Sequence, residues 1–199
     1  MIKKLVLSAT VASVATTLAV VFAAPAMAAG EAKNVIFFLG DGMGPVTKTA
    51  ARIYKYNEAG SLGMDTMPYT ARIKTYSLDA QTTDSAPSMA AYMTGVKERN
   101  DVVSMSGDTI AKAPSKDATT NVANAVTNCA PTGNGTAVMT LTEYAIAQGK
   151  ATGTVTTARL THATPAATYA HSCHRDAEYE IARQAIPGGS GFSGSFSGQ

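Results

Sequence analysis

One carboxylate stands at the end of an apolar run near the N-terminus. Val35–Leu39 comprises five consecutive apolar residues, a run typical of a strand that is buried on both faces. Asp41 follows between Gly40 and Gly42, and these glycines let another group approach the backbone closely. Ligands of open α/β sheets bind at the carboxyl ends of the strands, so we predict that Asp41 lies at a ligand site.

An aspartate and a serine precede the next informative pattern. Asp84 and Ser85 stand at the start of an expected helix, with Pro87 where the first turn of a helix tolerates proline. A serine hydroxyl there lies beside the free amides of a helix N-terminus, which attract anions. The commoner explanation of such a serine is an ordinary helix cap, and a serine needs a base or a metal to become a nucleophile.

All three histidines of the chain lie in one stretch, Thr161–Arg175. His162 and Thr164 flank the end of an expected strand, and His171 and His174 stand about two to three helical turns further on. A single histidine is more often a surface or core residue than a metal ligand. These residue types alone therefore do not define a site.

The surrounding pattern alternates strands with helices, which is typical of an α/β fold with a mainly parallel sheet flanked by helices. Gly95 is placed to end a helix, and Thr140 to Glu143 has the form of a capping box. The sheet looks incomplete at the C-terminus, where residues 188–199 form a Gly/Ser-rich tail. The expected strands are 35–39, 70–77 and 151–157, and the expected helices are 46–56, 85–94, 141–148, 165–171 and 176–186, with a short one at 121–126 inside a polar excursion over 97–136.

The N-terminal segment predicts export. Lys3 and Lys4 precede a mostly apolar stretch over residues 5–23, and Ala26-Met27-Ala28 has the form of a cleavage site. We interpret residues 1–28 as a signal peptide, and the mature chain as periplasmic or secreted, with no membrane segment after cleavage. A single transmembrane anchor is the alternative, because the apolar stretch is long.

Charge and cysteine content narrow the class of protein. Two of the 16 basic residues lie in the leader, which leaves 14 against 14 acidic residues, so the mature chain is near neutral. No basic block suggests nucleic-acid binding. Cys129 and Cys173 fit an oxidising compartment. They can pair with each other, stay free, or pair with a cysteine beyond this chain.

Three stretches together resemble one family. The segments NVIFFLGDGMG, TTDSAPSMAAYMTG and THATPAATYAHSCHR, in this order and at this spacing, are similar to alkaline phosphatases. The resemblance covers about Lys33 to Gly189, so we take residues 29–187 as the N-terminal part of an alkaline-phosphatase-like domain. It implies metal-dependent hydrolysis of phosphate monoesters through a phosphoserine intermediate, with zinc and magnesium as cofactors. It also allows a homodimer for a full-length protein.

The resemblance assigns roles to individual residues. It implies that Ser85 is the nucleophile and a metal ligand, that Arg175 binds the phosphate, and that Asp84 helps to hold this arginine. It further implies that Asp41 bridges the second zinc and the magnesium, and that the Thr164 hydroxyl is a magnesium ligand.

His162 matches a family position at which some members carry aspartate and others carry histidine, and it is a further candidate metal ligand. Histidine there weakens the case for an all-oxygen magnesium site. It favours zinc or another transition metal, or a role in holding a metal-bound water. His171 and His174 match no family ligand, and we expect both to be surface histidines at a helix end.

The resemblance is incomplete. Most zinc ligands of the family, two aspartates and three histidines, have no counterpart here, and neither does the glutamate of the third site. We therefore expect an incomplete part of an alkaline phosphatase. The alternatives are a non-catalytic secreted domain and a related hydrolase that acts on phosphodiesters or sulfate esters. The Asp84-Ser85-Ala86 setting together with Arg175 favours monoesters.

Overall fold

The computed structural model of the protein describes residues 32–121, 129–130 and 132–186. The chain divides into two compact units, residues 1–39 and 40–199. The signal peptide expected at 1–28 and the tail at 188–199 lie outside the described residues, as does nearly all of the expected helix at 121–126.

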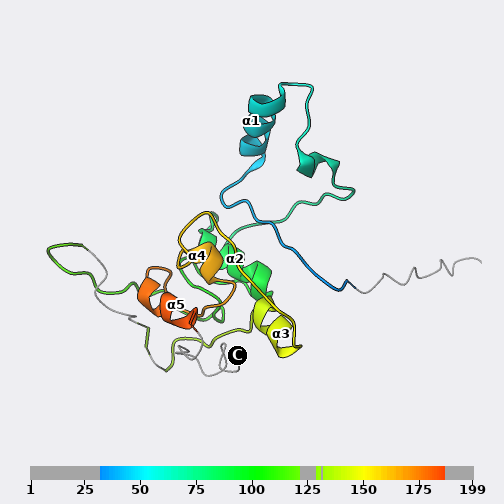
Figure 1. The fold of residues 1–199 in the computed structure, drawn as a ribbon. Coiled ribbons are helices and arrows are strands. Elements are labelled where there is room, and N and C mark those ends of the chain that lie inside the picture. The colour runs from blue at the N-terminus through cyan, green and yellow to red at the C-terminus, as the bar shows by residue number, and fades with distance from the viewer. Residues whose placement is uncertain (1–31, 122–128, 131, 187–199) are drawn as a thin grey trace, which may run out of the picture. The chain divides into compact units, whose positions relative to one another are not determined.

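Helices are the regular elements of the described part of the second unit, and long irregular segments connect them (Figure 1). The helices that position the candidate site are α2 and α4; α3 lies between them along the chain, and α5 follows α4. In chain order the helices are α1 (Pro45–Tyr56), the 3₁₀ helix η1 (Gly63–Thr66), α2 (Ser85–Thr94), α3 (Leu141–Ala147), α4 (Ala163–Ala166) and α5 (Glu178–Gln184).

Local end signals account for the helices that the sequence located best. Pro45 occupies the first turn of α1, and Gly95 ends α2 in the left-handed conformation at φ 74°. At α3, the Thr140 amide donates to Glu143 Oε2 over 2.7 Å, and the Glu143 amide donates to Thr140 Oγ1 over 3.2 Å. The predicted capping box is therefore confirmed.

The two C-terminal helices are shorter than expected. α4 ends at Ala166, although the pattern predicts a helix to residue 171. The Thr168 hydroxyl donates to the Pro165 carbonyl over 2.7 Å, and this side chain offers the backbone an alternative to a further helical turn. α5 covers Glu178–Gln184 instead of 176–186.

The predicted strands are not confirmed. Residues 35–39, 70–77 and 151–157 form no strand, and isolated antiparallel bridges join Val103 to Ser172 and Met105 to Ala137. A strand needs a neighbour for its hydrogen bonds and a layer that covers its side chains. Much of these segments lacks a covering layer among the described residues, since Phe38 is 87% and Val155 is 100% exposed. The expected parallel sheet is thus not formed by the described part of the chain.

A small core holds the second unit together where α2 packs against α4 and α3. Its helix faces are rich in alanine, and small side chains allow the helices to approach closely. The buried cluster consists of Ala86, Met89, Ala90, Met93, Val103, Ala163, Ala166, Ala167, Tyr169, Ala170 and Ile181.

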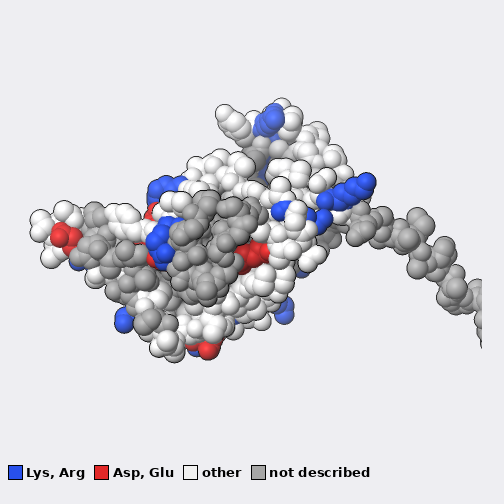
Figure 2. Space-filling model, turned by 60° about the horizontal axis from the view of Figure 1, so that its bottom comes forward, with Lys and Arg blue, Asp and Glu red and all other residues white. Residues whose placement is uncertain are grey.

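A disulfide joins Cys129 to Cys173, with 5.6 Å between the Cα atoms. Of the alternatives that the sequence leaves open, pairing within the chain is the one present. Within the described residues, no helix is both long enough and apolar enough to cross a membrane. Figure 2 shows basic and acidic side chains scattered over the described part of the face that it presents.

Candidate active site

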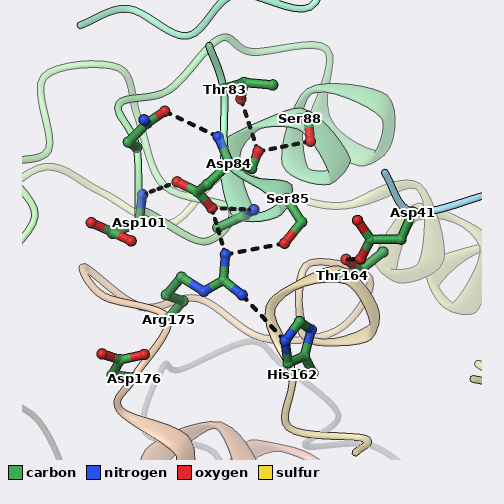
Figure 3. Close-up of polar contacts among 12 residues, drawn as sticks. Asp41, Thr83, Asp84, Ser85, Ser88, Asp101, His162, Thr164, Arg175 and Asp176 are labelled. Atoms are coloured by element: carbon green, nitrogen blue, oxygen red, sulfur yellow. Dashed lines mark hydrogen bonds and ion pairs between the residues drawn. The ribbon is translucent and has the colours of Figure 1, made fainter. Parts of the chain in front are cut away.

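Asp84 caps α2 and collects three hydrogen bonds. Its Oδ1 accepts from the Ala86 amide over 2.7 Å and from Arg175 Nη1 over 2.8 Å, and its Oδ2 accepts from the Asp101 amide over 2.6 Å (Figure 3). Aspartate is a preferred N-cap because its oxygen satisfies a free amide of the first turn. The cap therefore also anchors an arginine from a segment 91 residues further along the chain.

Ser85 is the first residue of α2 and lies next to this ion pair. Its Oγ accepts a hydrogen bond from Arg175 Nη1 over 3.1 Å. Because Asp84 fills the cap position, the reading of Ser85 as an ordinary helix cap is wrong. Its hydroxyl is half-buried at the positive end of a ten-residue helix, where an anion is stabilised.

The guanidinium of Arg175 contacts three side chains. Nη1 reaches Asp84 and Ser85, and Nη2 lies 3.3 Å from His162 Nε2. A guanidinium only donates hydrogen bonds, so His162 Nε2 accepts and the ring proton sits on Nδ1. That Nδ1 is buried and has no hydrogen-bond partner among the described residues.

Asp41 and Thr164 bring two candidate oxygen ligands together. Thr164 Oγ1, on α4, donates to Asp41 Oδ2 over 2.5 Å, although 123 residues separate the two in sequence. In the view of Figure 3, this pair lies on the side of Ser85 opposite to Arg175. Carboxylate and hydroxyl oxygens suit a hard cation such as Mg²⁺. The described residues contain no group of three or more His, Cys, Asp or Glu that could hold a metal ion.

Comparison with known proteins identifies the family. The alkaline phosphatase family profile matches residues 32–191. The chain belongs to the alkaline phosphatase family.

Relatives within the family are similar over most of this chain. It is 42% identical over 166 residues to the tissue-nonspecific alkaline phosphatase of Gallus gallus, which covers 79% of this chain and 29% of the relative. It is 40% identical over 167 residues to the alkaline phosphatase of Gadus morhua, covering 80% of this chain and 32% of the relative. The chain thus spans about a third of the length of these curated relatives.

Solved alkaline phosphatases share the fold. The enzyme from the Antarctic bacterium TAB5 superimposes with a TM-score of 0.51 at 27% identity, over 69% of this chain and 32% of that chain. A cold-active enzyme from Shewanella sp. gives 0.54 at 26% identity, over 73% and 31%. A histidine-to-glutamate variant of the TAB5 enzyme, with a TM-score of 0.54 at 27% identity over 73% and 34%, has magnesium bound in its M3 site.

In this member of the alkaline phosphatase family, two histidines are buried, so the expectation of surface histidines is wrong. His171 is 2% exposed, with Nδ1 2.7 Å from the Ser104 carbonyl oxygen and Nε2 3.0 Å from Glu143 Oε1. Burial raises the pKa of Glu143, but the hydrogen bonds from His171 and the Thr140 amide outweigh it and hold that pKa below its usual range. His171 therefore ties α3 to the segment that leads to the arginine.

His174 is buried directly before Arg175. Its Nδ1 accepts from the Asp176 amide over 3.1 Å, and its Nε2 lies 3.7 Å from Asp101 Oδ2. Burial raises the pKa of Asp101, and the neighbouring His174 opposes this only in part. Burial of either histidine depends on contacts with distant segments, which periodicity does not reveal.

Sequence reasoning also missed a turn behind Asp84. Asn100 and Asp101 lie in it, and both reach Asp84. The signal in the sequence was weak, because residues 97–101 (KERND) are typical of an ordinary polar loop. In the same loop Glu98 is fully buried, and burial raises the pKa of its carboxyl to about 9.

The Cys129–Cys173 disulfide holds the chain directly before Arg175. Cys173 stands two residues before Arg175 and is fully buried. Its carbonyl accepts from the Lys112 amide over 3.4 Å. The polar excursion over 97–136 is therefore tied both covalently and by hydrogen bonds to the segment that carries the guanidinium.

Proposed function

We propose that this chain is the part of a phosphate monoester hydrolase that carries the nucleophile and the phosphate clamp. The observation that carries the proposal is the contact of one guanidinium nitrogen, Arg175 Nη1, with both Asp84 and Ser85. Family membership supports hydrolysis of phosphate monoesters. In this proposal the guanidinium of Arg175 donates to two phosphate oxygens, which its planar fork suits, while Asp84 continues to hold it.

Ser85 is assigned as the nucleophile. Its Oγ forms a bond to phosphorus while the bond from phosphorus to the ester oxygen breaks, which releases the alcohol and leaves phosphoserine. Water then attacks the phosphorus, the bond to Ser85 Oγ breaks, and inorganic phosphate leaves. The amides at the N-terminus of α2 and the guanidinium of Arg175 face the negative charge in both steps.

Asp84 keeps the arginine aimed at Ser85. Its carboxylate is held by two backbone amides, so it presents a fixed acceptor to Arg175 Nη1. His162 supports Nη2 from the other side. We assign His162 to orienting the guanidinium in this arrangement. It becomes a metal ligand through Nε2 only if this contact is released.

Asp41 and Thr164 would hold magnesium, and Ser85 would contact the neighbouring zinc. When bound, such ions supply positive charge that makes the serine hydroxyl more acidic and stabilises the leaving oxygen. The two side chains that meet here are too few for a zinc site, which normally takes three or four protein ligands. We therefore expect no turnover of a chromogenic phosphate monoester by residues 29–199 alone. Turnover that is lost in Ser85→Ala would contradict this.

Export is part of the proposal. The leader-like residues 1–28 and the Cys129–Cys173 disulfide both fit a periplasmic or secreted protein. Mass spectrometry of the exported protein should find Ala29 at the N-terminus. Recovery of the intact leader in a membrane fraction would show that the segment is an anchor.

The decisive experiment traps the phosphoenzyme. In the longest reading frame that contains this sequence, labelled phosphate trapped at acid pH should map to the peptide with Ser85 and disappear in Ser85→Ala. Ser88→Ala is the matched control, because Ser88 is a second half-buried serine in the first turns of α2 and donates to the Asp84 carbonyl over 2.9 Å. Label that persists in Ser85→Ala would refute the assignment.

Arg175→Ala should leave the nucleophile in place and weaken the clamp. Loss of charge-assisted hydrogen bonds to phosphate predicts inhibition by inorganic phosphate that is about 10- to 100-fold weaker. Arg159→Ala is the control, because Arg159 pairs with Glu178 over 2.7 Å on the exposed surface. Equal inhibition of wild type and Arg175→Ala would remove Arg175 from the site.

A further inference from the structure

The turn behind Asp84 connects three parts of the candidate site. The Val102 amide donates to the Arg99 carbonyl over 3.3 Å, which places Asn100 and Asp101 at the centre of the turn. Asp101 has φ 69°, a backbone conformation that aspartate tolerates better than most residues. The turn follows α2 and precedes the buried Val103, so it lies between two packed segments.

Asn100 makes three hydrogen bonds outside its own turn. Its backbone amide donates to Asp79 Oδ1 over 2.9 Å, its Nδ2 donates to the Thr82 carbonyl over 3.2 Å, and its Oδ1 accepts from the Asp84 amide over 3.3 Å. These partners fix the orientation of the side-chain amide, because a backbone amide requires an oxygen and a carbonyl requires an NH₂ group. Asn100 therefore holds both ends of residues 79–84, the segment that leads into Ser85.

The next residue extends the same connection through its backbone. The Asp101 amide donates to Asp84 Oδ2 over 2.6 Å, and the Asp101 carbonyl accepts from the Arg175 amide over 2.7 Å. Figure 3 shows the first of these bonds beside the Asp84–Arg175 pair. Asp84 is thus held through its backbone by Asn100 and through its carboxylate by Asp101, and Arg175 is held to the same turn.

We infer that Asn100 is a positioning residue for the Ser85–Arg175 pair. The inference rests on the proposed function and adds to it a residue that touches neither phosphate nor metal. A residue that serves only the turn would bond within the turn, whereas the side-chain partners of Asn100 lie 16 and 18 residues earlier in the chain. Loss of this side chain frees the Asp84 amide and lets the start of α2 shift relative to the guanidinium.

Asn134 provides a matched control. Its side chain is also half-buried and also uses both ends of its amide, accepting from the Ile110 amide over 2.8 Å and donating to the Ile110 carbonyl over 3.0 Å. It forms no hydrogen bond with Asp84, Ser85 or Arg175 in the described structure. Asn134→Ala should therefore disturb a loop to a similar degree without moving the site.

The experiment combines hydrogen exchange with kinetics in the full reading frame. In Asn100→Ala, the peptide that contains Asp84 should exchange its amide about fivefold faster, the factor for one typical lost hydrogen bond. The kcat/KM for a phosphate monoester should fall about tenfold, and inhibition by inorganic phosphate should weaken. Asn100→Asp keeps an oxygen for the Asp84 amide and should recover part of both losses. Asn134→Ala should change neither quantity more than about twofold.

Two results would overturn the inference while leaving the proposed function intact. One is unchanged exchange of the Asp84 peptide in Asn100→Ala. The other is faster exchange with unchanged kcat/KM and phosphate inhibition in an enzyme that Arg175→Ala impairs. If the wild-type protein has no phosphatase activity, the proposed function fails, and the role of Asn100 in catalysis fails with it. The exchange comparison then decides only whether Asn100 holds Asp84.

Discussion

Helices α1 and α2 have similar lengths but opposite surroundings. α1 has no buried residue, and Ile53 on it is 39% exposed. α2 buries Ala86, Met89, Ala90 and Met93 against α4 and its neighbours. A helix can thus form from local signals alone, whereas a fixed side chain needs the packing that surrounds α2.

This difference divides the candidate site into two halves. Asp84 and Ser85 start α2, and Arg175 follows the buried residues 171–174, so the half that is proposed to bind the anion is built on the core. Asp41 lies in an exposed segment, and its side chain forms a hydrogen bond with Thr164 of α4. The proposed clamp is therefore preorganised by packing, whereas Asp41 stands outside the buried core.

The largest predicted effect tests the packing difference directly. Ile181 is fully buried in the core cluster, so Ile181→Ala should lower the free energy of unfolding by about 3 kcal/mol. Ile53→Ala removes the same atoms from an exposed helix and should cost less than about 1 kcal/mol. Denaturant unfolding of the two variants measures both values. Equal losses would show that α1 is packed as firmly as the core.

The pH dependence of stability should differ in sign between the two regions. Burial raises the pKa of Glu98 from 4.5 to about 9, so the folded protein keeps this carboxyl protonated where the unfolded chain ionises it. The contribution of Glu98 to the free energy of unfolding is complete below pH about 4.5. It is lost as pH rises towards 9, by about 1.4 kcal/mol per pH unit. Glu98→Gln should remove this slope from unfolding curves measured between pH 5 and 8.

Asp65 in the exposed segment gives the opposite case. The hydrogen bond from Lys48 and the Leu62 amide lower its pKa. Its stabilisation is therefore present above its ordinary pKa and is lost as pH falls through the lowered value. Asp65→Asn should therefore lower stability at neutral pH, and its difference from wild type should vanish at acid pH, where the wild-type carboxyl is also protonated. For the Glu98 prediction, a change of stability between pH 5 and 8 that persists in Glu98→Gln would mean that another buried group causes this pH dependence.

The smallest predicted effect concerns backbone strain. Asp101 in the site region and Asn57 at the end of α1 have φ values of 69° and 61°, which glycine adopts without steric cost. Asp101→Gly and Asn57→Gly should each change the free energy of unfolding by less than about 1 kcal/mol, because the backbone hydrogen bonds remain. A loss of several kcal/mol in Asp101→Gly would assign a structural role to its carboxylate, which lies 3.7 Å from His174.

The sequence predicted those features that depend on neighbouring residues. The start of α1, the end of α2 and the start of α3 follow from Pro45, Gly95 and the Thr140–Glu143 capping box, all of which act within one turn. The strands were not predictable in this way, because a strand is stabilised by a partner elsewhere in the chain. The same limit explains the error over His171, whose partners Glu143 and Ser104 are 28 and 67 residues away.

The candidate site shows the same division. A family resemblance predicted roles for Asp84, Ser85 and Arg175. The structure brings the side chain of Arg175 within hydrogen-bond distance of the other two. Asn100 was overlooked because its importance lies in its partners and not in its type. His162 was predicted to be a metal ligand or to hold a metal-bound water, and in the structure its Nε2 lies 3.3 Å from Arg175 Nη2.

The 91 residues between Asp84 and Arg175 set an order of events on the ribosome. At synthesis rates of about 5 to 20 residues per second, the start of α2 emerges roughly 5 to 20 seconds before Arg175. During that interval Asp84 can already cap the nascent helix through the Ala86 amide, since this bond spans two residues. Ser85, the proposed nucleophile, is thus presented early on a preformed helix end, and the proposed anion clamp is completed last.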